Sequence, residues 1–333
     1  LANGRATGVA YDRGGRTHHA RARREVIIAS GPIGSPHLLQ RSGIGPGHVL
    51  QAAGVEVLHD LPGVGENLQD HAEIYIQFAC KQPITLNSKM DLFSKGLIGL
   101  QWLLTKKGLG ATNHFEAGGF IRSSKDVAWP DIQYHFLPAA VRYDGHSPVK
   151  GHGFMILTGP NKPKSRGHVR LVSPDPYEHP HILFNYLDRE EDRQGFRDCI
   201  RLTREVMRQP AMDPFNAGEI APGPGVTTDD EMDDFVRDNL ESTYHPCGTC
   251  RMGRDALAVV DPELRVHGLD GLRVVDSSVF PAEPNGNLNA PTMMLAERAA
   301  DLIAGRPVLP PENAPVGAAA GVGTTQRPNA PLR

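Results

Sequence analysis

Residues 242–250 read STYHPCGTC and place His245 two residues before a Cys-x-x-C pair. Cys247 and Cys250 could form a redox pair or half of a zinc site, or they could be two small thiols packed beside a reactive histidine. A complete zinc site needs two further ligands, and the sequence holds neither a second Cys-x-x-C nor a His-x-x-x-His. A thioredoxin-like pair would stand at the start of a helix after a strand. We expect no metal and favour two thiols packed in a loop.

The composition fits a protein with a packed core. The 333 residues are 39% hydrophobic and 22% charged, which suits two domains or one large one. A net charge of −3 gives no general attraction to nucleic acid or to an anionic membrane surface. No apolar run reaches the roughly 18 residues of a membrane-spanning helix. The four cysteines, which also include Cys80 and Cys199, are too few for a disulfide scaffold and indicate a reducing compartment.

The segment before residue 45 predicts a strand, a glycine turn and a helix in that order. TGVAYD and REVIIAS flank the turn-rich GGRTHHA, which predicts a hairpin, and VIIAS is typical of a buried parallel strand. In residues 31–36, Ser35 can cap a helix that has Pro36 in its first position and continues to Gly43. This layout can direct amide groups at a phosphate or a flavin edge. Any strand–helix junction looks the same, so the turn alone leaves both interpretations open.

The pattern changes to that of an antiparallel sheet between about residues 72 and 235. EIYIQFAC, DIQYHFLP, HGFMILTGPN and GHVRLVS alternate or run apolar with β-branched and aromatic residues. Amphipathic helices are predicted over residues 190–212 and 228–240, the second with acids in its first turn. Residues 264–280 return to a strand pattern, and MMLAERAADLIAG forms a last apolar-faced helix.

Three blocks together resemble one family, the glucose–methanol–choline (GMC) oxidoreductases. GPIGSPHLLQRSGIG at 31–45 fits the second sequence signature of that family. STYHPCGTCRMG at 242–253 resembles the stretch that bears its catalytic histidine, and residues 265–303 resemble its C-terminal flavin-closing segment. In order, the blocks extend the resemblance over nearly all of residues 5–305. Within the family, HFEAGGF and DIQYHFLPAAVRYDG are most similar to choline dehydrogenases.

The resemblance implies a mixed α/β (α+β) fold and a longer parent protein. The dinucleotide fingerprint G-x-G-x-x-G after a first strand is absent. The sequence therefore resembles a C-terminal portion: the remainder of a Rossmann-like FAD-binding domain plus a substrate domain built on a mostly antiparallel sheet with helices. The expected parts are a piece of the FAD-binding domain at 1–71, the substrate-binding domain at 72–240, a return to the FAD-binding domain at 241–305, and a disordered tail at 306–333.

The implied reaction is FAD-dependent oxidation of a primary alcohol, choline to betaine aldehyde, by hydride transfer to the flavin. An alkoxide donates hydride more readily than an alcohol, so a base must lie near the oxygen, and histidine suits this near neutral pH. His245 matches the acid/base residue of the family. Asn289 matches the position paired with that histidine, and its amide can both donate and accept. The alternatives are an enzyme acting on a neutral alcohol and a truncated chain without catalysis.

A choline pocket must hold a trimethylammonium group, which aromatic faces and a carboxylate attract. Glu116 matches the family position that faces this cation. A buried, unpaired glutamate would be costly unless a cation compensated it; the alternative is a surface carboxylate. Tyr244, beside His245, is the expected aromatic wall, with Phe115 and Tyr134 as weaker candidates.

The flavin contacts that the resemblance implies come from three segments. Thr292 is expected to start the last helix, whose positive end would stabilise negative charge on the reduced ring. Asp276 follows an apolar strand, where sites gather in α/β sheets; the alternative there is a helix cap, which Ser277 could equally be. The full set is Ala29, Ser30, Gly31, Asp276, Ser277, Asn287, Pro291 and Thr292.

The implied partners are a small alcohol, choline by resemblance, and an electron acceptor. The sequences of the motifs are more like those of dehydrogenases, which favours a respiratory quinone chain as electron acceptor. Such an acceptor implies peripheral attachment to the cytoplasmic side of an inner membrane. Oxygen-using oxidases share the same motifs. Oxidation of choline serves the synthesis of glycine betaine.

Overall fold

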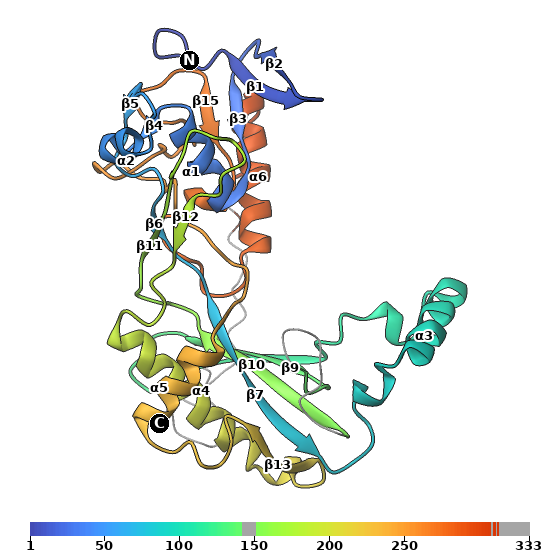
Figure 1. Ribbon diagram of the computed structural model, residues 1–333. Coiled ribbons are helices and arrows are strands. Elements are labelled where there is room, and N and C mark those ends of the chain that lie inside the picture. The colour runs from blue at the N-terminus through green and yellow to red at the C-terminus, as the bar shows by residue number, and fades with distance from the viewer. Residues whose placement is uncertain (142–150, 308, 311, 313–333) are drawn as a thin grey trace. The chain divides into compact units, whose positions relative to one another are not determined.

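The computed structural model describes residues 1–141, 151–307, 309, 310 and 312 (Figure 1). These residues form two compact units. Unit 1 combines residues 1–71, 162–188 and the described residues from 244 onward, and unit 2 combines residues 72–161 and 189–243. The structure thus assigns residues 162–188 to unit 1, although they fall within the predicted substrate domain. The predicted tail at 306–333 lies almost entirely outside the described residues.

Unit 1 begins with a hairpin and a short parallel strand. β1 (Gly8–Arg13) pairs antiparallel with β2 (Arg16–Arg21) through two glycines that both have positive φ, as the tight turn requires. The second hairpin strand is therefore RTHHAR, a segment that its turn-rich sequence places in the turn. β3 (Val26–Ile28) instead pairs in parallel with β15 (Leu272–Val274). The expected parallel strand is confirmed, but the expected hairpin partner is wrong.

α1 (Gly31–Arg41) follows β3 directly, with Ser30 as its N-cap residue. The prediction that Ser35 caps this helix is wrong, because the helix already begins at Gly31. Ser35 lies inside it, where its hydroxyl donates to Asp276 Oδ2 at 2.5 Å and accepts from the main-chain N–H of Ser30. The serine therefore connects the start of α1 to the end of β15.

Pro36 lies inside α1 rather than at its first position. A proline has no N–H, so the carbonyl one turn earlier, that of Pro32, loses its helical partner. The hydroxyl of Thr249 donates to this carbonyl at 2.6 Å. The segment after His245 thus completes the hydrogen bonding of α1.

The remainder of unit 1 is organised around a buried amide. β6 (Glu66–Leu68), β11 (Gly167–Arg170) and β12 (His181–Leu183) form a three-stranded antiparallel sheet. Gln40 of α1 donates to the carbonyls of Val64 and Val169 and accepts from the N–H of Leu171. These bonds join residues 162–188 to unit 1. The smaller elements are α2 (Gly47–Ala52) and the parallel pair β4 (Ile44–Gly45) with β5 (His59–Asp60).

α6 (Asn289–Ala304) closes unit 1 and ends at Gly305, which has the left-handed conformation common at helix ends. The expectation that Thr292 starts this helix is wrong. Pro291 fits within the first turn, and both the N–H and the hydroxyl of Thr292 donate to the carbonyl of Leu288. Leu295 and Ala299 turn into the core of unit 1, which also contains Ile28, Leu39, Ile44, Val64 and Val274.

Unit 2 contains the predicted antiparallel sheet, so the mixed α/β class is confirmed. Its strands lie in the order β13-β7-β10-β9-β8, and β14 (Glu241–Ser242) pairs with the start of β7. All pairings in this sheet are antiparallel. The strands are β7 (Ala72–Cys80), β8 (Ala117–Ile121), β9 (Ile132–Leu137), β10 (Gly153–Pro160) and β13 (Asn216–Ala221).

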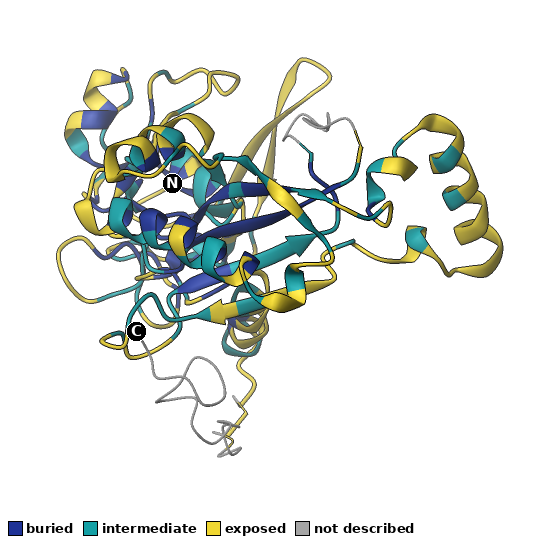
Figure 2. Cartoon of the chain, turned by 90° about the horizontal axis from the view of Figure 1, so that it is seen from below, coloured by how far each residue is buried: buried dark blue, intermediate teal, exposed yellow. Residues whose placement is uncertain are grey.

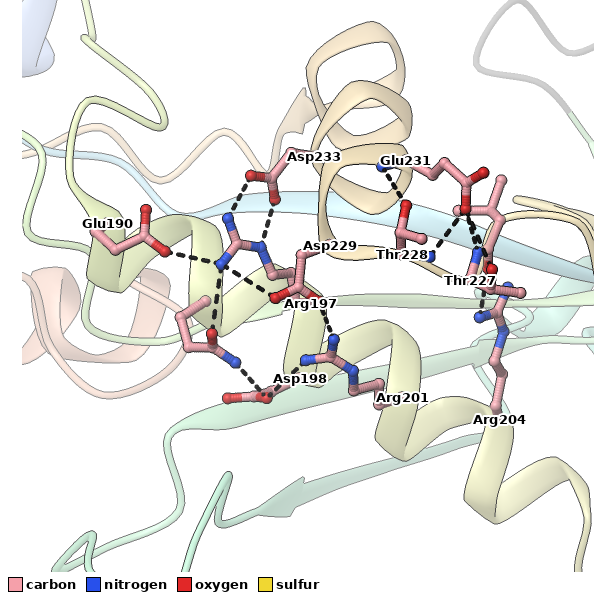
Figure 3. A network of polar contacts seen from close by, with 12 residues as sticks. Glu190, Arg197, Asp198, Arg201, Arg204, Thr227, Thr228, Asp229, Glu231 and Asp233 are labelled. Atoms are coloured by element: carbon pink, nitrogen blue, oxygen red, sulfur yellow. Dashed lines mark hydrogen bonds and ion pairs between the residues drawn. The ribbon is translucent and has the colours of Figure 1, made fainter.

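Two predicted helices of unit 2 are confirmed. A salt bridge connects them. α4 (Glu190–Met207) contacts β10, and α5 (Asp229–Asn239) begins with a capping box between Thr228 and Glu231. Arg197 of α4 donates through Nε to Asp233 of α5 at 2.7 Å and through Nη2 to the other oxygen of the same carboxylate (Figure 3). Such a two-bond pair fixes geometry as well as charge.

α3 (Leu92–Thr105) is a helix that the sequence analysis did not predict. None of its residues is buried, and Figure 2 shows it largely exposed. It is reached through η1 (Leu86–Lys89) and followed by η2 (Leu109–Ala111). Two other short 3-10 helices are η3 (Pro210–Met212) and η4 (Ser277–Val279). Among the residues that the structure describes, no helix combines the length and apolar character needed to span a bilayer.

Candidate active site

His245 is held by its main chain and by both ring nitrogens. Its N–H donates to Asp70 Oδ1 at 2.9 Å, and the other oxygen of Asp70 accepts from the hydroxyl of Tyr186. Nδ1 lies 3.2 Å from Nδ1 of His71, and Nε2 lies 3.2 Å from Nδ2 of Asn287. A half-buried histidine held in this way can exchange a proton at one nitrogen while the other keeps its partner.

Asn287, rather than Asn289, contacts His245 in unit 1. Asn287 precedes α6 and is exposed, whereas Asn289 is the first residue of the helix. The sequence analysis placed Asn287 among the flavin contacts and paired Asn289 with the histidine. In the string NGNLN, turn asparagines look alike, and only the backbone path decides which one reaches the ring.

His71 and Glu283 are two polar residues beside His245 that the sequence analysis did not single out. Both are buried, at 5% and 3% exposure. Glu283 Oε1 lies 3.3 Å from His71 Nδ1, the same nitrogen that faces His245. Burial raises the pKa of Glu283 to about 9, and the neighbouring Asp70 adds to the effect. The only sequence signal is their proximity to recognisable blocks: His71 ends NLQDH, and Glu283 stands between two prolines.

Tyr244 occupies an unusual backbone conformation next to His245. Its φ is +59°, a region that bulky residues rarely adopt, and its side chain is 68% exposed. Strain of this kind is typical of functional sites. The conformation gives the ring an accessible position, as an aromatic wall for a ligand requires.

Glu116 lies in unit 2 and is exposed. Its Oε1 accepts from the hydroxyl of Thr112 at 3.1 Å. Within the described chain it is a surface carboxylate, which was the alternative to a buried one. Phe115 beside it is 45% exposed and meets His135 edge to face. Tyr134, in contrast to Phe115, is largely buried, and burial raises the pKa of its hydroxyl. Residues of α4 also act on this pKa, so the hydroxyl faces that helix.

The predicted flavin contacts at the start of α1 are accessible. Ala29 and Ser30 are exposed, and Ser30 forms no side-chain cap on the helix. Gly31 has a φ of +78°, and a Cβ atom added there would meet nothing within 4 Å. The turn therefore leaves open space on the Cα side of Gly31, while the N–H of Gly31 is already bonded to Asp276 Oδ2.

Asp276 uses its carboxylate within the protein. Oδ2 accepts from the N–H of Gly31 and the hydroxyl of Ser35, and Oδ1 accepts from the N–H of Ser278. Asp276 is the cap of η4, which is the structural alternative stated for this position. Ser277 donates through its hydroxyl to the carbonyl of Pro246 at 3.2 Å. Both residues thus join the strand end to segments that carry site residues.

The start of α6 is the second accessible helix terminus of unit 1. Its cap residue, Leu288, provides no side-chain hydrogen bond. Pro291 and Thr292 are half-buried in the first turn, whereas Met293 and Met294 are 62% and 61% exposed. The start of α6 therefore combines amide groups without a side-chain cap and exposed apolar side chains.

The Cys-x-x-C pair lies inside the core of unit 1. Cys247 and Cys250 are fully buried and are free thiols. Burial raises the pKa of both thiols well above the ordinary range, so neither is a ready nucleophile. This agrees with the packed-thiol interpretation. In the described ranges, no group of three or more histidine, cysteine or acidic side chains is arranged to hold a metal ion.

Comparison with known proteins identifies the family. Residues 1–73 match the N-terminal domain of the GMC oxidoreductases, and residues 163–296 match their C-terminal domain. The chain is 56% identical over 335 residues to the oxygen-dependent choline dehydrogenase of Photobacterium profundum, covering 100% of this chain and 59% of that relative. It is 58% identical over 331 residues to the enzyme of the same name from Vibrio vulnificus, covering 99% of this chain and 59% of the relative.

Solved structures agree with this assignment. Pyridoxine 4-oxidase from Mesorbium loti superposes with a TM-score of 0.79 at 30% identity, covering 92% of this chain and 56% of that one. Formate oxidase from Aspergillus oryzae gives 0.85 at 25% identity, covering 91% and 58%. The chain belongs to the GMC oxidoreductase family. It spans about 59% of the length of the curated relatives it matches.

Proposed function

We propose that the complete protein is an FAD-dependent dehydrogenase that oxidises choline to betaine aldehyde. The observation that carries the proposal is the position of His245 between His71 and Asn287, in a chain that is 56% identical to a named choline dehydrogenase. A histidine that removes a proton from a hydroxyl is helped by one polar partner at each ring nitrogen, because these partners fix its orientation and its tautomer.

In the proposed reaction His245 removes the hydroxyl proton at Nε2. Nδ1 then retains its proton toward His71, and the main-chain bond to Asp70 holds the loop in place. Asn287 lies on the Nε2 side and orients the substrate oxygen, because its amide can donate or accept without changing charge. Asn289 is instead the first residue of α6.

The residues present fit FAD. The turn at Gly31 leaves open space for an approaching group, and the start of α6, whose cap residue forms no side-chain hydrogen bond, offers amide groups to an anionic or electron-rich group. Ala29, Ser30, Gly31, Pro291 and Thr292 would contact the cofactor, while Asp276 and Ser277 would hold the contacting segments in position. When bound, FAD supplies the acceptor for the hydride that leaves the alcohol carbon.

Tyr244 would give the choline cation an aromatic face, and Glu116 is the carboxylate that the resemblance to the family assigns to this cation. Tyr244 offers an exposed ring beside His245, and Glu116 offers an accessible carboxylate. A quaternary ammonium cannot donate a hydrogen bond, so an aromatic face and a negative charge are the contacts that distinguish it from a neutral alcohol.

Anaerobic bleaching of the flavin band tests the proposal. The complete protein is mixed with choline, and separately with 3,3-dimethyl-1-butanol, which has the same shape without the charge. Bleaching by choline at far lower concentration supports the choline assignment. Equal bleaching by both alcohols would support oxidation of an alcohol but contradict a pocket for the choline cation. No bleaching by any alcohol would contradict the proposed reaction itself.

We propose a respiratory quinone as electron acceptor and attachment to a membrane surface. The supporting observation is α3, where Leu92, Phe93 and Leu104 are 88%, 75% and 76% exposed. The helix also presents Trp102, with Lys106 over its ring at 4.1 Å, and residues 92–107 contain Lys95, Lys106 and Lys107 but no acid. Exposed apolar side chains, an interfacial tryptophan and lysines are typical of helices that lie on anionic lipid.

Vesicle sedimentation of the complete protein tests the membrane attachment. We expect binding to vesicles that contain phosphatidylglycerol, weaker binding to phosphatidylcholine alone, and loss of binding in Leu103→Asp. Gln101→Asp is the control, because it adds the same charge to α3 without removing an apolar side chain. Equal binding by wild type and Leu103→Asp would contradict the role of α3, as would burial of α3 against a second copy or another part of the parent protein.

The acceptor is tested separately. The relatives are named as oxygen-dependent, so oxygen is the second candidate. With choline present, reduction of a soluble quinone under argon supports the respiratory acceptor. If the enzyme turns over only when oxygen is admitted, in the absence of quinone, oxygen is the acceptor and the quinone proposal is wrong.

A further inference from the structure

Glu283 is a buried carboxyl for which the proposed reaction has no use. It is 3% exposed, and among the described residues neither of its carboxyl oxygens accepts a well-formed hydrogen bond. Its main chain is fixed, because its N–H donates to Gln69 Oε1 at 3.2 Å and its carbonyl accepts from Lys162 Nζ at 2.7 Å. An incompletely bonded buried carboxyl destabilises a fold, so its position calls for another explanation.

His71 connects Glu283 to His245. Its Nδ1 lies 3.3 Å from Glu283 Oε1 and 3.2 Å from Nδ1 of His245, and the two rings meet edge to face. The three titratable groups therefore converge on a single nitrogen atom. That atom can carry one proton or accept one hydrogen bond, but not both.

We propose that Glu283 is a positioning residue that acts through His71 to decide which nitrogen of His245 carries the proton. The inference rests on the proposed role of His245 as the base. A neutral Glu283 that carries its proton on Oε2 presents an uncharged Oε1 without a proton to His71 Nδ1, so this nitrogen keeps its lone pair and accepts the Nδ1 proton of His245. Nε2 of His245 is then free to remove a proton on the side of Asn287.

An ionised Glu283 has the opposite effect. Its negative charge favours a proton on His71 Nδ1, and Nδ1 of His245, 3.2 Å from that nitrogen, cannot then carry a proton as well. A neutral His245 in this state carries its own proton on Nε2 and cannot act as a base there. The protonation state of Glu283 therefore switches His245 between a form ready for catalysis and a blocked form.

The surroundings of Glu283 favour the neutral acid near pH 7. Burial raises its pKa to about 9, and the carboxylate of Asp70 acts in the same direction. The main-chain N–H of His71 and two basic side chains oppose the shift without cancelling it. The titratable and charged groups that face Glu283 are Asp70, His71, Lys162, Arg166 and the thiol of Cys247.

Glu283→Gln in the complete, FAD-loaded protein tests the proposal. Glutamine keeps the shape and cannot ionise, so we expect flavin bleaching by choline within about twofold of wild type at pH 7. As the pH rises through about 9, the wild-type rate falls, whereas the Glu283→Gln rate does not. The same alkaline loss in both proteins would overturn the proposal.

Glu283→Leu and His71→Asn test whether the effect passes through His71. We expect His71→Asn to lower the bleaching rate by about tenfold or more, because nothing then biases the proton on His245. Glu283→Leu, which is uncharged at every pH, should behave like Glu283→Gln. The double variant should lose no more than the stronger single variant, since both act on one path. A larger loss in the double variant than in His71→Asn would overturn the connection through His71.

Infrared spectroscopy gives a readout that does not depend on turnover. The wild-type protein at pH 7 should show the carbonyl stretch of a protonated carboxyl, and this band should be missing from Glu283→Gln. Its absence from wild type would overturn the proposal for Glu283 alone. Failure of every alcohol to bleach the wild-type flavin would instead overturn the proposed reaction, so the two failures are distinguishable.

Discussion

Asn287 Nδ2 and His245 Nε2 lie 3.2 Å apart, whereas Asn289 opens α6 two residues further along the chain. The first asparagine can therefore orient an oxygen at the reactive nitrogen, and the second cannot take that place without moving the helix terminus. We expect Asn287→Ala to lower the rate of flavin bleaching by choline about tenfold, and Asn289→Ala to change it by less than about twofold. A larger loss of bleaching rate in Asn289→Ala than in Asn287→Ala would show that Asn289, and not Asn287, orients the substrate oxygen.

Glu116→Gln separates recognition of the cation from recognition of the alcohol. Removing the negative charge should raise the choline concentration for half-maximal bleaching by about tenfold, the effect of one cation contact. The value for 3,3-dimethyl-1-butanol should stay the same. Glu178→Gln is a matched control, because Glu178 is also an exposed carboxylate. An equal change in the half-maximal concentration of both alcohols would show that Glu116 does not bind the cation and is only a surface carboxylate.

Glu73 of β7 and Glu241 of β14 are opposite each other in register. Burial raises the pKa of Glu73 to about 7, and the like charge of Glu241 adds to the shift. The folded state therefore holds a proton that the unfolded state releases above pH 4.5, so the free energy of unfolding falls as the pH rises from 4.5 to about 7. The loss amounts to roughly 3 kcal/mol.

Glu73→Gln should remove this pH dependence, because glutamine does not titrate. Urea unfolding at pH 5 and pH 8 measures the effect as a difference between wild type and variant. The variant should gain stability relative to wild type at pH 8 and little at pH 5. A parallel pH dependence in both proteins would show that Glu73 is ionised in the folded state.

Arg197 fastens α4 to α5 from a position where its side chain is 10% exposed and that of Asp233 is 13% exposed (Figure 3). Arg197→Ala leaves this carboxylate without its main partner, which should cost about 3 kcal/mol. Arg237→Ala breaks an ion pair with Asp234 in which both side chains are more than half exposed, and should cost about 0.5 kcal/mol or less. Urea midpoints of the two variants compare them directly, and similar shifts would contradict a structural role for the buried pair.

The sequence predicted those elements whose own residues determine them. The apolar spacing of α4 and the acids and cap of α5 act within one turn, and the antiparallel sheet follows from alternation along each strand. α1 begins earlier than predicted because Asp276 and Thr249, far away in sequence, satisfy its first turn. The sequence does not predict α3, because apolar residues dominate it and its few polar residues give only a weak periodicity.

The sequence singles out His245 but not the residues that the structure places around it. His245 stands in a recognisable block, whereas Glu283 and His71 gain their importance from a shared nitrogen atom that only the fold brings together. Asp276 shows the reverse case. Its position at a strand end indicated a ligand, yet three protein donors occupy its carboxylate.

Unit 1 is assembled from three separated stretches of chain, and this imposes an order on biosynthesis. β3 cannot pair until β15 has left the ribosome, which at roughly 5–20 residues per second takes more than about ten seconds. During that interval β3 and α1 lack their partners β15 and η4, while the strands of unit 2 emerge and can associate. Nascent chains halted before residue 264 should therefore bind chaperones through residues 26–41, and chains released after α6 should not.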